Sequence, residues 1–200
     1  MSDRGDPFEW SGGHPALDFV NTLDERPFDA PIENLAAYGD LVRFAELAEL
    51  IEPSMAARLR KLDGPVCVRV AKCARKLREH LYDLLAAVLS DRPVRQTDLD
   101  AITAAIQAAH KARALVTSSS RELVGYCWSP AMAPDIPLHA CALAIERLLV
   151  DVDRKRIRKC GVSDCAVYYV DTSKAQLRQW CSMKGCGNRE KQRRWRSGPQ

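Results

Sequence analysis

The sequence predicts a mainly α-helical protein: a helical N-terminal domain with a small β-hairpin, then a C-terminal module of hairpin and helix built around four cysteines. Three observations predict this. Apolar residues recur at helical spacing through most of the first 150 residues. Four of the eight cysteines fall in two evenly spaced pairs between residues 160 and 186. Residues 151–200 hold 13 basic and 5 acidic side chains, a net charge of +8, whereas residues 1–150 hold 17 and 21, a net charge of −4.

Helical periodicity places the elements of the first domain. The longest stretch begins at Val66, and its residues Val70, Leu77 and Leu81 fall on one apolar face. Turn signals that contain proline separate the stretches, and Thr97 is the expected cap of the fourth helix. The expected helices cover residues 34–51, 53–62, 66–89, 98–111 and 138–152.

A change of composition after residue 112 predicts the hairpin. Two β-prone runs, 114–117 and 122–128, flank a triple serine at 118–120. The last helix then leads directly into a basic stretch, and we place the domain boundary within residues 152–159. The expected domains are residues 1–152 and 153–200.

Composition limits the cellular setting. No run of eighteen apolar residues occurs, so no membrane partner is expected, and the start lacks the basic-then-apolar order of a secretory signal. We therefore expect a cytoplasmic protein whose cysteines stay reduced. Four cysteines stand scattered among apolar neighbours and are expected to be buried, inert thiols: Cys67, Cys73, Cys127 and Cys141.

The remaining cysteines have the arrangement Cys160-x4-Cys165-x15-Cys181-x4-Cys186. Two close pairs separated by a hairpin-sized gap allow two turns to present four thiolates to one tetrahedral Zn²⁺. Four thiolates leave no coordination position for water, so a structural zinc is expected rather than a catalytic one. The alternatives are a pair of disulfides, four unrelated thiols, or a zinc site that oxidation empties.

A basic helix is expected to follow Cys186. Arg189, Arg193 and Arg196 recur at i, i+4 and i+7 and share one face, which suits the phosphates and groove edges of DNA. Trp195 could stack on bases, whereas Trp180 is expected to pack against the zinc hairpin. The alternative is a solvated or protein-docking basic face. The candidate nucleic-acid contacts are Arg178, Lys184, Asn188, Arg189, Lys191, Arg193, Arg194 and Arg196.

A polar cluster near the start has two interpretations. Asp18, Asn21 and Thr22 would share a helical face and could line a ligand pocket with His14, or all four could be cap and turn residues. No nucleophile–base pair, phosphate loop or GxSxG motif accompanies them, so we expect no enzyme.

The C-terminal residues resemble the CGNR zinc-finger module, named for the sequence found here from Cys186 to Arg189. The likeness extends to Trp180-Cys181-Ser182-Met183 and Tyr169-Val170-Asp171, and the opening Gly12–Leu23 resembles the ABATE domain that usually precedes this finger. The resemblance implies four cysteine ligands, a treble-clef-like hairpin and helix, and a bacterial transcription regulator linked to stress responses.

The sequence departs from the family pattern in two places. Lys174 and Ala175 stand where members commonly have Arg-Asn, and Gln179 stands where they often have Arg. Lysine lacks the bidentate fork of arginine, which removes the ground for inferring a phosphate contact at that loop.

Together these observations predict a transcription regulator that binds DNA through the zinc module and basic helix, with a sensory or dimerising N-terminal domain. The alternative is a zinc-stapled protein-interaction module without direct DNA binding. This interpretation leaves room for a homodimer and for an unidentified small-molecule or stress signal as further partners.

Overall fold

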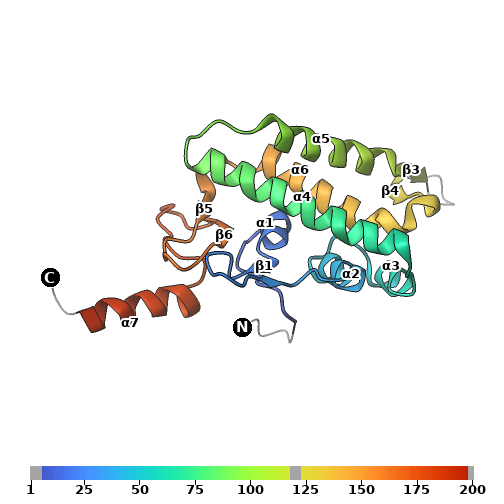
Figure 1. Ribbon diagram of the computed structural model, residues 1–200. Coiled ribbons are helices and arrows are strands. Elements are labelled where there is room, and N and C mark those ends of the chain that lie inside the picture. The colour runs from blue at the N-terminus through green and yellow to red at the C-terminus, as the bar shows by residue number, and fades with distance from the viewer. Residues whose placement is uncertain (1–5, 118–122, 198–200) are drawn as a thin grey trace. The chain divides into compact units, whose positions relative to one another are not determined.

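The computed structural model describes residues 6–117 and 123–197, and within them it contains seven α-helices and three two-stranded antiparallel sheets (Figure 1). This confirms the predicted mainly α fold class. The chain divides into two compact units. Residues 35–147 form one, called here the helical unit, and residues 1–34 together with 148–200 form the other, called the terminal unit. The predicted domain boundary at residues 152–153 stays a prediction.

The helical unit is built on two long helices. α4 (Pro65–Leu89) and α5 (Gln96–Lys111) pack against each other in antiparallel directions (Figure 1). The fully buried Leu81 and Leu85 of α4 belong to its core. The shorter helices α2 (Tyr38–Leu47) and α3 (Pro53–Leu59), the turn η1 (Pro130–Asp135) and most of α6 (Ile136–Asp151) complete the helices of this unit.

The predicted hairpin is confirmed as β3 (Arg113–Thr117) paired with β4 (Leu123–Trp128). The serines predicted to form its turn lie outside the described residues. Cys67 and Cys141 are buried as expected and Cys73 is half-buried, but the prediction is wrong for Cys127, which is exposed on β4. Alternation along a strand places it on the face opposite Tyr126 and Trp128.

Two helix boundaries differ from prediction for identifiable reasons. α2 begins only at Tyr38 because the carbonyls of Leu35 and Ala36 accept hydrogen bonds from Arg75 instead of continuing a helix (2.8 and 3.0 Å). The predicted cap Thr97 is wrong, since α5 begins one residue before it. The Asp98 carboxylate bonds back to the Arg95 guanidinium and closes the first turn (2.9 Å).

The terminal unit brings both ends of the chain together. Its N-terminal part holds α1 (Pro15–Val20) and the strands β1 (Leu23–Asp24) and β2 (Ile32–Glu33). Its C-terminal part holds the turn η2 (Arg154–Arg156), the hairpin β5 (Ile157–Lys159)–β6 (Tyr168–Val170), the π-helical turn η3 (Met183–Gly187) and α7 (Asn188–Ser197).

Hydrogen bonds fix the N-terminal part to strand β6. The Asn21 side chain donates to the Tyr168 carbonyl (2.9 Å) and accepts from the Tyr168 amide (3.0 Å). The Val170 amide donates to the Gly12 carbonyl (2.8 Å). Because Asn21, Tyr168 and Tyr169 are buried, these bonds form in a site from which water is excluded. Strand β6 is therefore bonded to β5 and also to the N-terminal part of the unit.

Candidate metal centre and nucleic-acid interface

The four cysteine sulfurs of the terminal unit converge on one point. All four Sγ atoms lie within 4.8 Å of one another, with Cys181–Cys186 at 3.5 Å and Cys165–Cys181 at 3.9 Å. A tetrahedral ion with Zn–S bonds of about 2.3 Å requires sulfurs about 3.8 Å apart. The sulfur spacing therefore fits Zn²⁺, and these cysteines form the predicted structural zinc site.

Backbone hydrogen bonds shape the two cysteine turns. The Cys160 amide donates to the Val167 carbonyl (2.9 Å) and closes the first turn, and the Cys181 amide donates to Cys160 Sγ (3.5 Å). In the second turn, the Gly185 amide donates to the Ser182 hydroxyl (3.2 Å). These bonds shape the turns so that the sulfurs point to a common centre.

The electrostatics of the sulfur cluster also suit a cation. Hydrogen bonds from the thiols of Cys165 and Cys181 hold the pKa of Cys160 far below its usual value. The same Cys160 thiolate raises the pKa of Cys165 to about 12 and also raises the pKa of Cys181. Four thiolates cannot exist together here without a positive charge among them. A divalent ion supplies that charge and displaces the shared protons.

The residues of the Cys-Gly-Asn-Arg run make contacts that connect the metal centre to α7. A Cβ on Gly187 would lie 2.6 Å from Met183 Sδ, so a larger residue there would have to displace the Met183 side chain. The Asn188 amide donates to the Lys184 carbonyl (3.2 Å) as α7 begins. Arg189 Nη2 donates to Cys186 Sγ (3.2 Å), a charge-assisted bond to a zinc ligand that raises the pKa of Arg189. The motif thus joins the metal centre to the helix.

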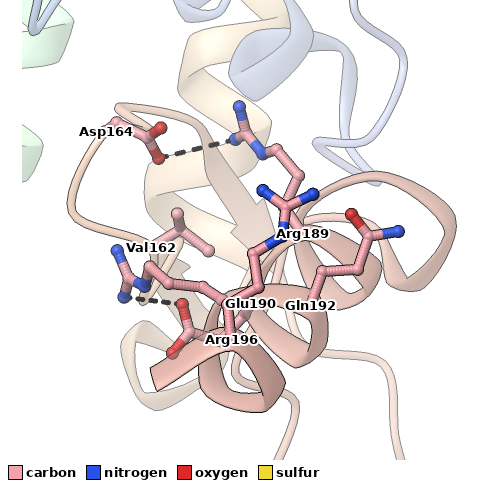
Figure 2. Close-up of a pocket in the computed structure, with 7 residues that line it drawn as sticks. Val162, Asp164, Arg189, Glu190, Gln192 and Arg196 are labelled. Atoms are coloured by element: carbon pink, nitrogen blue, oxygen red, sulfur yellow. Dashed lines mark ion pairs between the residues drawn. The ribbon is translucent and has the colours of Figure 1, made fainter. Parts of the chain in front are cut away.

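The arginine face predicted to meet DNA partly faces the protein's own first cysteine turn. Figure 2 shows Arg189 reaching Asp164 (3.6 Å), while Arg193 pairs with Glu190 (2.6 Å). Arg193 also donates to the Ser163 hydroxyl (3.3 Å). A hollow of about 340 Å³ is lined by Val162, Asp164, Arg189, Glu190, Gln192, Arg193 and Arg196 (Figure 2). The arginines remain exposed at its rim.

The other side of α7 is more open. Lys191 and Arg194 are exposed, and Trp195 is 85% exposed. Lys184 is exposed on η3. Helical spacing places Lys191 and Trp195 on the face opposite Arg189 and Arg193. The helix therefore offers cations on both sides, but only those beside the cysteine turn are drawn into contacts with it.

Arg178 lies in a turn that the sequence analysis did not assign. Its guanidinium sits over the Tyr169 ring at 4.4 Å, donates to the Trp180 carbonyl (2.9 Å) and also bonds the Cys181 carbonyl. The Asp171 carboxylate accepts from the amides of Ser173 and Arg178 (2.9 Å each). A hydrogen bond from the Ser173 side chain, followed by these amide bonds, holds the pKa of Asp171 below the usual range. The run Tyr169-Val170-Asp171 was the available signal for this turn. Trp180 packs against the cysteine cluster as predicted.

The structure gives each member of the polar cluster near the start a partner. His14 Nδ1 caps α1 by accepting from the Ala16 amide (3.2 Å), and Asp18 accepts from the Gly12 amide (2.8 Å). The Thr22 hydroxyl donates to the Phe19 carbonyl (2.7 Å), and Asn21 holds Tyr168. The four side chains thus stabilise the local backbone, and the ligand-pocket interpretation stays a prediction.

Comparison with known families agrees with this geometry. Residues 13–152 match ABATE, a family described as "Putative stress-induced transcription regulator". The chain belongs to the ABATE family. Residues 156–197 match the CGNR zinc finger, which contains the four clustered cysteines and α7. A search of curated proteins found no match to this ABATE chain. No helix in the described part of the chain is long and apolar enough to cross a membrane.

Proposed function

We propose that this ABATE protein binds DNA directly through α7, which the zinc centre holds in place, and that it acts as a regulator rather than an enzyme. The observation that carries the proposal is the basic helix that begins two residues after the zinc ligand Cys186. α7 carries five cationic side chains and one acidic one within Asn188–Ser197. Its ten residues span about 15 Å, a length suited to a major groove about 12 Å wide.

Geometry separates the five cations by their contacts, and one of them, Arg194, pairs with Glu190 on the same helix (3.2 Å). Arg189 contacts Cys186 and Asp164. Arg193 contacts Ser163 and Glu190. These two arginines therefore stabilise the module as well as adding charge. Lys191 and Arg196 are exposed, and the structure gives neither of them an ion pair within the described residues. We expect these two to meet phosphates first.

The test is retention of random duplex DNA by the full-length, zinc-loaded protein at several salt concentrations. The logarithm of the binding constant should fall with that of the salt concentration at about −0.9 per phosphate contacted, so roughly −3 to −5 for each chain. Lys191→Ala with Arg196→Ala should flatten the slope by about 2. The matched control, Arg58→Ala with Lys61→Ala, removes the same charge from exposed positions of the helical unit.

The two variants together decide the proposal. Equal losses from both would mean that net charge, not α7, attracts DNA. A protein that holds one zinc per chain yet retains no DNA at low salt would contradict direct binding and favour a zinc-stapled protein-interaction module. The sensory or dimerising role of the N-terminal residues is a separate part of the proposal and is tested by DNA retention with and without a candidate signal.

A further inference from the structure

The helical unit contains a cavity far larger than the spaces around the polar cluster near the chain start. It has a volume of about 460 Å³ and lies between the α2–α3 connection and strand β4. Leu50 and Met55 line it from the helical side, and Tyr126 and Trp128 from the strand. This volume falls within the range of about 300–1,000 Å³ that is typical of small-molecule sites.

The aromatic wall of the cavity is held in place. Tyr126 and Trp128 stand two residues apart on β4 and so project to the same face of the strand. The Trp128 indole stacks on the His139 ring, with centroids 6.2 Å apart and planes 18° from parallel. Burial lowers the pKa of His139, so its ring is neutral at neutral pH and brings no positive charge to this wall.

The charge around the cavity is negative. Two exposed carboxylates, Glu49 and Glu52, stand at its edge, and none of the described residues that line it is basic. A smaller neighbouring cavity of about 230 Å³ shares Leu50, Tyr126 and Trp128 and is lined by two arginines, Arg113 and Arg147, and one carboxylate, Glu146. The Arg113 guanidinium lies 4.3 Å from the centre of the Tyr126 ring, so this wall already holds one cation on an aromatic face.

A hydrogen-bond chain connects Arg113 to a carboxylate in the smaller cavity. Its Nη2 donates to His110 Nδ1 (3.1 Å), and His110 Nε2 in turn bonds the Glu146 carboxylate (2.9 Å). The larger cavity retains two carboxylates without such basic partners among its lining residues.

The backbone conformation at Glu49 concerns the end of helix α2. Glu49 has a φ of +57°, a left-handed conformation that glycine or asparagine adopts at lower cost. The position ends helix α2, where glycine is the common choice. Glu25, Asp91 and Gln176 share this conformation, so it bears on the stability of the α2 end rather than on ligand binding.

We propose that this cavity binds an organic cation with a bulky aromatic body, whose charge lies between the Glu49 and Glu52 carboxylates and whose rings pack on Trp128, Tyr126 and Met55. Aromatic faces attract a desolvated cation, and carboxylates at the rim add to that attraction. The site is independent of the zinc module and of DNA binding.

The experiment uses two probes of the same shape and opposite charge. Tetraphenylphosphonium chloride and sodium tetraphenylborate are titrated separately into the full-length, zinc-loaded protein in an isothermal calorimeter. The cation should bind at least tenfold more tightly than the anion. This comparison needs no variant, so a folding defect cannot obscure it.

Variants then locate the site. Glu49→Gln with Glu52→Gln should lower the affinity for tetraphenylphosphonium about tenfold. Trp128→Leu should lower this affinity about three- to tenfold by removing the aromatic face. The control, Asp63→Asn with Asp100→Asn, removes the same charge from exposed positions of this unit that do not line the cavity. Glu49→Gly should raise the Tm of the protein and lower its affinity for the cation.

Three results would overturn the proposal. The first is equal affinity for the two probes, which would show an apolar cavity indifferent to charge. The second is no heat of binding with tetraphenylphosphonium. The third is a control variant that weakens the cation as much as the glutamate pair does, which would move the effect from the cavity to the net charge of the protein.

Discussion

Asn21 shows how much one side chain can hold together in this protein. Its carboxamide satisfies both the amide and the carbonyl of Tyr168, and both residues are buried. Asparagine is one of the few side chains that can donate and accept at once with this geometry. A backbone group left unpaired in a buried site costs about 1–3 kcal/mol.

We therefore expect Asn21→Ala to lower the free energy of unfolding by about 2–4 kcal/mol, because it leaves two buried groups of Tyr168 unpaired. Urea denaturation of the zinc-loaded protein measures this. Gln96→Ala is the control, since the Gln96 amide bonds Asp100 at the exposed surface (2.8 Å) and should change stability by about 0.5 kcal/mol at most. Equal effects from the two changes would contradict the role of Asn21.

Arg189 is the second residue with an effect beyond its own contacts. Its bond to Cys186 Sγ should hold the ligand sulfur and offset the negative charge of four thiolates. Arg189→Gln should speed zinc release to a chromogenic chelator about 10–100-fold, the range seen when a group behind a metal ligand is lost. Arg194→Gln removes the same charge from an exposed position on α7 and should release zinc at the wild-type rate.

At the scale of elements, the pairing of α4 with α5 depends on one buried carboxylate. Asp98 of α5 accepts hydrogen bonds from Arg95 (2.9 Å) and from His80 of α4 (2.9 Å). The Arg95 bond, followed by the His80 bond, holds the pKa of Asp98 below its usual value of 3.8 in spite of burial. A carboxyl whose pKa falls on folding stabilises the fold at pH values above the unfolded pKa.

This stabilisation should be present near neutral pH and lost as the pH falls below about 3.8, through the folded pKa of Asp98. Asp98→Asn should therefore lower the urea midpoint at pH 7, and the difference from the wild type should shrink as the pH falls. Taking the difference between the two proteins cancels zinc loss in acid, which affects both. A difference in urea midpoint between the two proteins that stays constant from pH 7 to pH 3 would show that Asp98 acts through packing alone.

The elements themselves could be predicted largely from sequence, and the reasons are local. α4 was predicted to within one residue because the apolar stripe of Val70, Leu77 and Leu81 is regular, and it begins one residue early because Pro65, taken as part of a turn, is its first residue. α2 was predicted too long, since the Arg75 side chain that takes up its leading carbonyls comes from another helix. Periodicity reports on the residues of one segment and carries no information about such a distant partner.

The same distinction applies to the candidate site. Cysteine spacing revealed the metal centre, because the ligands of a small zinc module lie close together in sequence. The spacing could not reveal that Asn21 and Gly12 complete the hairpin, since they lie about 150 residues away from it. Nor could helical phase show that Asp164 and Ser163 would face Arg189 and Arg193.

At the scale of the whole molecule, zinc should control more than the finger. The metal turns, β6 and α1 belong to one compact unit. Chelating the zinc should therefore loosen residues 14–22 as well as residues 156–197, while α4 in the helical unit keeps its protection. Hydrogen–deuterium exchange with and without a zinc chelator measures this. Unchanged exchange in residues 14–22 after zinc removal would show that Asn21 and Gly12 hold their strand without the metal.

The shared unit of the two chain ends also has a consequence for synthesis. The first 34 residues leave the ribosome long before their partners, and the intervening residues 35–147 form a unit of their own. Residues 35–147 can therefore fold on the nascent chain before residues 1–34 have their partners. Their folding would bring the two flanks closer and shorten the effective loop that has to close. We expect the helices to fold first, and the binding of metal by the four cysteines to complete the terminal unit.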